Sequence, residues 1–140
     1  MCIRDRYWVN KNYMKKQIIN TSKAPQPIGA YNQAIISNGF VFTAGQVPID
    51  PTSGKIVAGN FQARVRRVMN NLQAILKESG TNLSNVTKFT VFLTDISKYA
   101  IVNEVFSEFL NDNEAPARSL IEVSSLPAGA DIEIDCIASF

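Results

Sequence analysis

Arg118 is the residue whose type and setting point most directly to chemistry. It stands in the stretch NEAPARSLIEV, between a proline and an apolar run of β-prone residues. Long charged side chains seldom enter such a setting without a partner. A planar guanidinium binds a carboxylate through two parallel hydrogen bonds, so a carboxylate ligand is one candidate partner. An ion pair with Glu122 or with a neighbouring subunit is the more ordinary alternative, and the residues alone leave both open.

The chain contains no histidine, and this excludes several kinds of active site. A Ser-His-Asp triad, a Cys-His pair, a histidine metal ligand and an imidazole acid–base group are all ruled out. The two cysteines, Cys2 and Cys136, are too few for a disulfide framework or a thiolate zinc site. Cys136 is interpreted as a reduced core thiol, which predicts a reducing, cytoplasmic setting. The net charge of +2 is too small to imply a nucleic-acid or membrane partner by itself.

The elements that must position these residues follow from the hydrophobic pattern of a 140-residue chain, which suits one domain. An Asn-Gly pair at 38–39, between two β-prone runs, predicts a hairpin. Apolar residues recur with helical spacing from Asn60 to Ser79, with Asn60 suited to the N-cap and Gly80 to the left-handed position after the helix. The other expected elements are a strand near residues 17–20, a strand over 85–95, a helix over about 98–111, and two closing strands in SLIEV and DIEIDCIAS.

Two amphipathic helices cannot cover both faces of a sheet of about six strands. We therefore expect a two-layer α+β domain with both helices on one face of the sheet. In the last strand, Ile132, Ile134 and Cys136 alternate with Glu133 and Asp135, so the two acidic residues should point away from the helices. That second face of the sheet must be exposed to solvent or covered by another subunit. We favour subunit packing, because the strands also place apolar residues on this face.

Five stretches, in this order and spacing, resemble those of a known family: PIGAYNQAI, FVFTAGQVPIDPTSGKIV, VTKFTVFLTDISKYAIVNEVFSEF, APARSLIEV and DIEIDCIA. Together they closely resemble the Rid family (YjgF-like proteins, the reactive intermediate deaminases), and within it the RidA branch. The resemblance covers about residues 15–138. The first 13 residues lie outside it, and we predict that they are an extension that is not native. The native chain would then start at Met14, and residues 14–140 would form a single Rid-family domain.

The resemblance implies a chorismate-mutase-like fold with a mixed sheet, elements in the order βββαβαββ, and a homotrimer with sites between subunits. It also implies hydrolysis of reactive 2-imino acids, such as 2-iminobutanoate and 2-iminopropanoate, or of their enamine tautomers, to 2-oxo acids and ammonia. No metal or organic cofactor is implied. The expected partners are the small 2-imino or 2-oxo acid and the other subunits, with no membrane, and a nucleic-acid partner is not favoured.

The resemblance assigns roles to individual residues. Arg118 would hold the substrate carboxylate, and Glu133 would position or deprotonate the attacking water and help carry a proton to the leaving ammonia. Tyr31 would wall the cleft, the Gly45 amide would help hold the carboxylate, and Asn103 would contribute to the cleft or to the subunit interface. Without the resemblance, Glu133 would be interpreted as a solvated strand glutamate and Tyr31 as a strand aromatic. Gly45 would be a strand-end glycine, and Asn103 an ordinary polar helix position.

Two positions depart from the family pattern. Ala44 stands where many members have serine, and Leu120 stands where many have cysteine. Both are assigned to the substrate-binding set by position, without the hydroxyl or thiol. Thr43 does not replace the lost hydroxyl, because it alternates to the other face of its strand.

Two other functions remain in view. A trimeric, non-enzymatic module could use Arg118 to bind 2-oxo acids for regulation. An RNA-directed role, as a ribonuclease or translation inhibitor, would need a basic surface, and the only cluster is Arg64, Arg66 and Arg67 on the first helix. Helical spacing spreads these three around a polar face, and no base-stacking aromatic pattern accompanies them.

Overall fold

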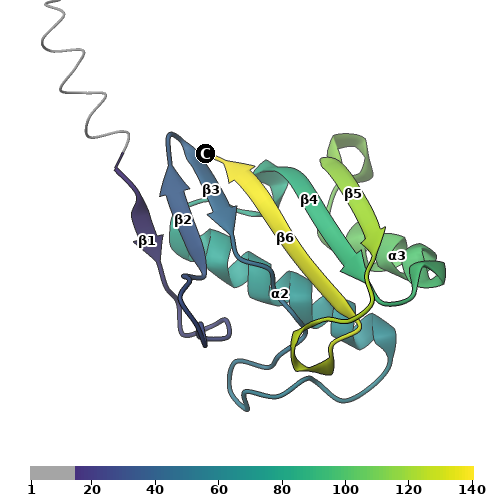
Figure 1. Ribbon diagram of the computed structural model, residues 1–140. Helices are drawn as coiled ribbons and strands as arrows, with labels where there is room; N and C mark the ends of the chain where they lie inside the picture. Colours follow the sequence, from purple (N-terminus) through teal and green to yellow (C-terminus); the bar gives the residue numbers. More distant parts are fainter. Residues whose placement is uncertain (1–14) are drawn as a thin grey trace, which may run out of the picture.

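The computed structural model describes residues 15–140, in which six strands form one mixed sheet (Figure 1). The prediction that residues 1–13 are not native lies outside the described residues. The strand order across the sheet is β1-β2-β3-β6-β4-β5, antiparallel except for the parallel pair β4 and β5. The strands are β1 (Gln17–Ile19), β2 (Ala34–Ser37), β3 (Phe40–Thr43), β4 (Val86–Leu93), β5 (Ala117–Glu122) and β6 (Ile132–Ser139).

The predicted hairpin joins β2 and β3. Asn38 and Gly39 both have positive φ, 54° and 82°, as a two-residue type I′ turn requires. This turn sets the register that pairs Ile36 with Val41, and it places Val41 in the core. The Asn-Gly interpretation is confirmed.

The long helix α2 (Phe61–Ser79) has the caps that the sequence predicts. The Asn60 side chain accepts a hydrogen bond from the Ala63 N–H at 2.9 Å, and Gly80 adopts the left-handed conformation at φ 91°. Its buried stripe follows the i, i+3, i+4 spacing. The large apolar members of that stripe are Phe61, Val65, Val68, Met69, Leu72, Ile75 and Leu76.

The second helix, α3 (Tyr99–Phe109), begins and ends close to the expected range. A single 3-10 turn, Ile96–Lys98, leads into it, and Asp95 caps that turn by accepting from the Ser97 N–H at 3.0 Å. Leu110 is already extended, so the helix stops well before Pro116, which starts the approach to β5.

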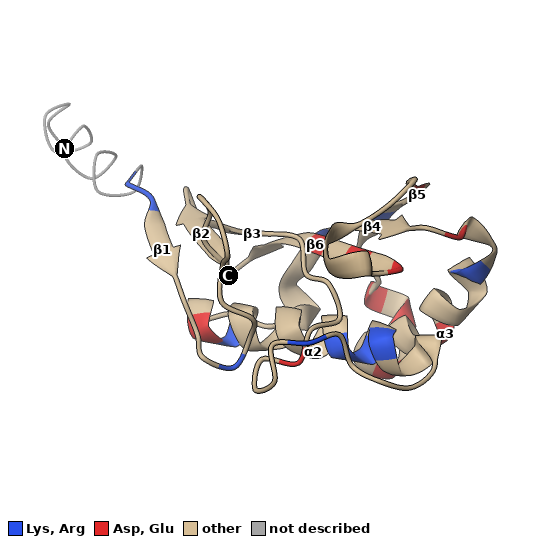
Figure 2. Ribbon diagram, turned by 60° about the horizontal axis from the view of Figure 1, so that its bottom comes forward, with Lys and Arg blue, Asp and Glu red and all other residues tan. Residues whose placement is uncertain are grey.

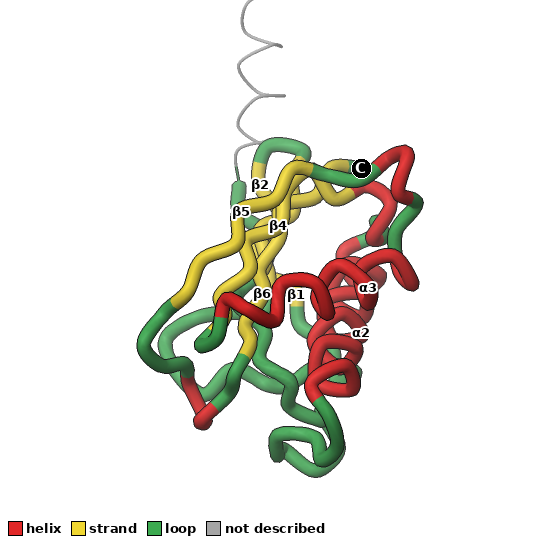
Figure 3. Tube along the Cα trace, turned by 90° about the vertical axis from the view of Figure 1, so that its right-hand side faces the viewer, coloured by secondary structure: helices red, strands yellow, loops and turns green. Residues whose placement is uncertain are grey.

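Both helices lie on one face of the sheet, which confirms the two-layer α+β arrangement (Figure 3). The core between the layers contains Ile132, Ile134 and Cys136, all 2% exposed or less, as the alternation of β6 predicts. Burial raises the pKa of the Cys136 thiol to about 12, so it is an inert core thiol. Within residues 15–140 no helix is both long and apolar enough to span a membrane.

The other face of the sheet carries apolar side chains that no helix covers. Phe42 pairs with Ile137 across β3 and β6, on the face opposite the buried Val41 and Ala138. Large apolar side chains are scarce at full exposure on a lone subunit, and a contiguous set of them marks an interaction face. The exposed large apolar residues of the strands are Ile18, Phe40, Phe42 and Ile121.

Candidate functional site

Three of the predicted site residues, Tyr31, Gly45 and Glu133, line one cleft of about 130 Å³. Glu133 enters it from the second residue of β6, on the sheet face without helices. Loops supply the rest of the wall. The full lining is Pro25, Gln26, Ile28, Tyr31, Gln33, Gly45, Gln46, Val47, Ile49, Pro127, Ala128 and Glu133.

Gly45 lies directly against the Glu133 carboxyl group. Gln46 forms an antiparallel bridge with Ile134, with hydrogen bonds of 2.8 and 3.0 Å between their backbones, and this bridge fixes Gly45 beside Glu133. A Cβ atom at position 45 would lie 2.7 Å from Glu133 Cδ, closer than real Cβ atoms approach. Glycine is therefore required sterically while Glu133 keeps this position. Within residues 15–140 the Gly45 N–H has no hydrogen-bond acceptor, so it is available to a ligand.

Tyr31 stands on a loop, three residues before β2, and not in a strand as its sequence setting had allowed. Its side chain is half exposed, and its hydroxyl oxygen accepts from the Ile28 N–H at 3.4 Å. Ala44 lies next to Gly45 in the chain, and its N–H donates to the Gln33 carbonyl at 2.8 Å. Thr43 faces the other way and accepts from the Cys136 N–H at 3.0 Å, so the hydroxyl missing at position 44 is not replaced.

Two buried amides that the sequence analysis missed hold the walls of this cleft. Gln33, 1% exposed, donates to the Thr21 and Pro25 carbonyls at 3.0 and 2.9 Å and thereby fixes the loop before Tyr31. Asn71, fully buried on α2, donates to the carbonyl of Ile49, another lining residue, at 2.9 Å and fixes that part of the wall. A signal for Asn71 was available, because its position falls within the apolar stripe of α2, where a polar residue needs a partner.

Two carboxyl groups on the open face of β6 hold their protons more tightly than usual. Burial, and then the charge of Asp135, raise the pKa of Glu133. Burial also raises the pKa of Asp135, while a hydrogen bond from Thr90 and the charge of Lys88 oppose that rise. A carboxyl with a raised pKa exchanges protons more readily near neutral pH, which suits proton transfer.

Asp135→Asn is expected to stabilise the protein at neutral pH. The folded state raises the pKa of Asp135, so it binds protons more readily than the unfolded chain, and stability falls as pH rises from about 4 through the raised value. Asparagine removes that loss and keeps an oxygen for Thr90. Urea unfolding from pH 4 to 7 should show the variant more stable at pH 7 and the difference closing toward pH 4. A pH-independent difference, or one equal to that of the exposed Glu104→Gln, contradicts the assignment.

Arg118 and Asn103 line a different cavity, of about 420 Å³, on the helix side of β5. The Arg118 guanidinium carbon lies 5.4 Å from the centre of the Phe106 ring, a cation–π contact with α3. Leu120 lies on the same face two residues on and packs against the core. Glu122 was the alternative ion-pair partner for Arg118, but its side chain instead accepts a hydrogen bond from the Ile96 N–H at 3.0 Å. Neither ion pair within residues 15–140 includes Arg118.

Arg118 and Glu133 lie on opposite faces of the same sheet. Arg118 is in register with Phe89, which is in turn in register with Cys136, and both partners are buried beneath the helices. Glu133 is in register with Phe92, which lies three residues after Phe89 on β4 and therefore points to the opposite face. The Glu133 side chain thus points to the face without helices. One subunit therefore does not bring the two predicted catalytic residues together.

The comparisons with known proteins identify the family. A family model described as Endoribonuclease L-PSP matches residues 21–140. The chain belongs to the Rid (YjgF-like) family. This Rid-family chain is 48% identical over 125 residues to a RutC family protein of Pyrococcus abyssi, covering 89% of this chain and 98% of that one.

Two further members are similar over most of their length. A 2-iminobutanoate/2-iminopropanoate deaminase of Rattus norvegicus is 41% identical over 123 residues, with 88% of this chain and 89% of the relative covered. The crystal structure of RidA from an Antarctic Psychrobacter species has a TM-score of 0.84 at 39% identity, with 89% and 99% of the two chains covered. The expected fold is confirmed by these likenesses, and members of the family with deaminase names occur near 40% identity.

Proposed function

We propose that this protein hydrolyses 2-imino acids, such as 2-iminobutanoate and 2-iminopropanoate, to 2-oxo acids and ammonia. The observation that carries the proposal is the cleft in which the Glu133 carboxyl, with its raised pKa, lies against Gly45 and its free backbone N–H. The deaminase name of a 41% identical relative supports the same reaction. The buried, free Cys136 supports a reducing, cytoplasmic setting for it.

The reaction needs two groups that this chain offers, Arg118 and Glu133. Arg118 binds the substrate carboxylate with its two parallel N–H groups, and this fixes the adjacent C=N carbon. The substrate nitrogen is protonated, and water adds to that carbon as the Glu133 carboxylate takes one of its protons. Glu133 then gives this proton to the nitrogen, which leaves as ammonia when the C–N bond breaks. The electrons of the remaining O–H bond form the C=O bond of the 2-oxo acid, and its proton passes to Glu133, which can protonate the next imine.

Both groups meet only if two subunits share a site, because Arg118 and Glu133 lie on opposite faces of one sheet. The exposed apolar face of β1, β2 and β3, with Phe40 and Phe42, supports close packing of a second copy on the face that bears Glu133. Arg118 lies on β5, an edge strand, and is exposed, so it can reach a neighbour. A homotrimer with three such shared clefts satisfies this requirement.

The remaining predicted residues receive supporting roles in the proposed site. Tyr31 walls the Glu133 half, and the Gly45 N–H supplements Arg118 at the carboxylate. Asn103 and Leu120 shape the Arg118 half. Ala44 itself offers no side-chain donor, so the carboxylate depends more strongly on Arg118 and on the backbone.

Gly45→Ala is expected to lower imine hydrolysis by about tenfold or more, because the new methyl group must push the Glu133 carboxyl out of place. The melting temperature should change little, since the displaced atoms are the end of a flexible side chain. Steady-state kinetics and thermal unfolding of the same samples measure both effects. In a Glu133→Gln background, Gly45→Ala should cause little further loss. An independent loss there would show that the substitution acts elsewhere.

A coupled assay tests the proposed function directly. A threonine dehydratase generates the short-lived imine, and 2-oxobutanoate is followed with and without this protein. Faster appearance of the 2-oxo acid is expected. If the wild type binds 2-oxobutanoate but leaves the rate unchanged, the proposal fails and the non-enzymatic binding module takes its place.

The basic cluster on α2 offers no support for an RNA-directed role. Arg64 is paired with Asp131, and Arg66 is paired with Glu108 on α3. In Figure 2 the basic segments of the two helices lie on α2, and α3 beside it carries acidic segments. Phosphate binding would have to break these contacts, and salt-dependent RNA affinity is the direct measurement.

A further inference from the structure

The cavity that contains Arg118 is lined by one other charged side chain, that of Asp112. The rest of its lining is neutral, with Phe89, Phe106 and Leu110 as the large apolar members. A carboxylate and a guanidinium therefore share one space of about 420 Å³, which is within the usual size range of small-molecule pockets. Neither ion pair within residues 15–140 joins the two groups, so a ligand can contact both.

Contacts with α3 and within its own turn hold Asp112 at this cavity. The Ser107 hydroxyl, on α3, lies 3.1 Å from a carboxylate oxygen of Asp112 and 3.1 Å from the Asn103 carbonyl, and it can donate to either. The 3-10 turn that starts at Asp112 is capped by Asn111, whose side chain accepts from the Asn113 N–H at 3.1 Å. The Asp112 carboxylate is therefore placed beside the cavity by both the helix and the turn.

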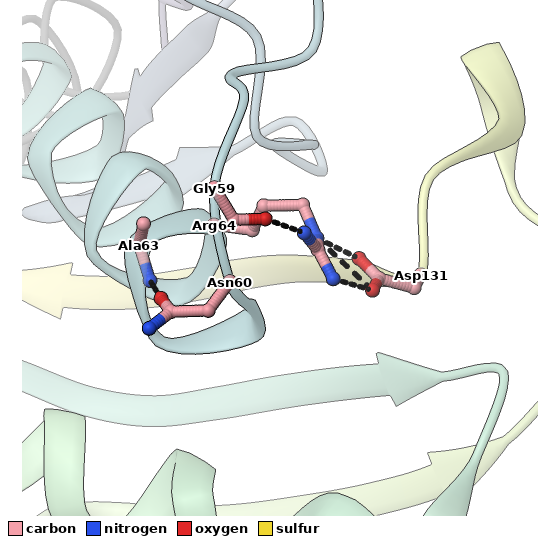
Figure 4. A network of polar contacts seen from close by, with 5 residues as sticks. All are labelled: Gly59, Asn60, Ala63, Arg64 and Asp131. Carbon is pink, nitrogen blue, oxygen red and sulfur yellow. Dashed lines mark hydrogen bonds and ion pairs between the residues drawn. The ribbon is translucent and has the colours of Figure 1, made fainter.

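The charge of Asp112 is not cancelled by an ion pair within residues 15–140. Asp131 provides the contrast, because the Arg64 guanidinium donates to its carboxylate at 2.7 to 3.0 Å (Figure 4). Glu108 is paired with Arg66 in the same way. The donor to Asp112 is a hydroxyl group, which carries no charge. The negative charge of Asp112 therefore acts on any ligand that enters the cavity.

We propose that Asp112 makes the Arg118 cavity selective for monocarboxylates. Arg118 binds the carboxylate next to the C=N or C=O carbon, and the apolar wall accepts the side chain of the ligand. A second carboxylate on that side chain enters the same space as Asp112 and is repelled by it. The substrates are then 2-imino acids with uncharged side chains, and those derived from dicarboxylic amino acids are rejected. As a statement about substrates this rests on the proposed function, whereas the binding selectivity does not.

Calorimetry with two 2-oxo acids of equal chain length tests the selectivity in the full-length protein. 2-Oxopentanoate has one carboxylate and 2-oxoglutarate has two, and the wild type should bind 2-oxopentanoate more tightly. In Asp112→Asn the affinity for 2-oxoglutarate should rise about threefold or more relative to that for 2-oxopentanoate, because the repulsion is removed. Asparagine keeps an oxygen for the Ser107 hydroxyl. Because Asp112 is exposed, the gain should shrink at about 0.5 M salt, which screens its charge.

Two variants separate this effect from a change in net charge. Glu114→Gln is the matched control, because Glu114 is an exposed carboxylate of the same turn that does not line the cavity. It should change the affinity ratio less than about 1.5-fold. Asp112→Glu keeps the charge and should keep the selectivity.

The outcomes distinguish this inference from the proposed function. An unchanged affinity ratio in Asp112→Asn, an equal change in Glu114→Gln, or tighter binding of 2-oxoglutarate by the wild type overturns the inference. A wild type that binds neither acid also overturns it, since the cavity then does not accept carboxylates. A wild type that prefers 2-oxopentanoate but does not accelerate imine hydrolysis removes the proposed function and leaves the selectivity standing.

Discussion

Arg118→Ala is expected to lower kcat/KM for imine hydrolysis about 100-fold or more. The guanidinium supplies two charge-assisted hydrogen bonds to the substrate carboxylate, and each such bond contributes about 1.5 to 3 kcal/mol. No other cation of the described chain lies in the Arg118 cavity. The dehydratase-coupled assay measures the rate, and calorimetry with 2-oxobutanoate measures the loss of affinity without depending on turnover.

Two variants control this result. Arg118→Lys keeps the positive charge but loses the planar guanidinium with its two parallel N–H donors, so it should recover only part of the affinity. Arg66→Ala removes an arginine that is held by an exposed ion pair on α2, and it should leave activity near the wild-type level. Equal activity of Arg118→Ala and wild type would remove Arg118 from the mechanism. Equal melting temperatures would show that any loss concerns the site. That is expected because Arg118 is exposed and its guanidinium packs on the Phe106 ring without an ion pair to residues 15–140.

Mixing two inactive variants is expected to restore activity. If each site takes Arg118 from one subunit and Glu133 from the next, a trimer of Arg118→Ala and Glu133→Ala subunits contains sites that lack neither side chain. Random assembly at equal amounts makes about a quarter of the sites complete, so about a quarter of the wild-type rate should return. The two variants are unfolded together, refolded as a mixture, and assayed beside each variant refolded alone.

The geometry makes this outcome specific. Within one subunit the sheet separates the two side chains, and a site built inside one subunit could not be repaired by mixing. A double variant, Arg118→Ala/Glu133→Ala, mixed with either single variant is the control, because it supplies neither missing group and should restore nothing. Absence of recovery in a refolded, oligomeric mixture would contradict a site shared between subunits.

Much of the architecture follows from local patterns in the sequence. Three examples are the Asn38–Gly39 turn, the capped apolar stripe of α2 and the alternation of β6. Each depends on residues that lie only a few positions apart in the chain. Backbone sterics and hydrophobic periodicity act over that range, so these elements could be predicted. The alternation alone also placed Glu133 on the face away from the helices, where the structure finds it.

The candidate site could be predicted only in part, because its geometry depends on contacts distant in the sequence. The close approach of Gly45 to Glu133 comes from the Gln46–Ile134 bridge, which joins positions 88 residues apart. The buried amides of Gln33 and Asn71 likewise act between separate segments. No local propensity encodes such pairings, since their register is set when the whole core packs.

The sequence by itself determined that this chain has no imidazole chemistry, that its fold has two layers, and that Arg118 stands in a setting that calls for a partner. These conclusions need only composition, periodicity and residue type, whereas the resemblance to the Rid family assigned the roles of Arg118 and Glu133. The tertiary structure alone decided that the two residues lie on opposite faces of one subunit. The parallel register of β5 on β4 aligns Arg118 with the buried Phe89, whereas Glu133 is aligned with Phe92. A one-residue change of register would reverse a side chain's face, and only the packed sheet fixes which register forms.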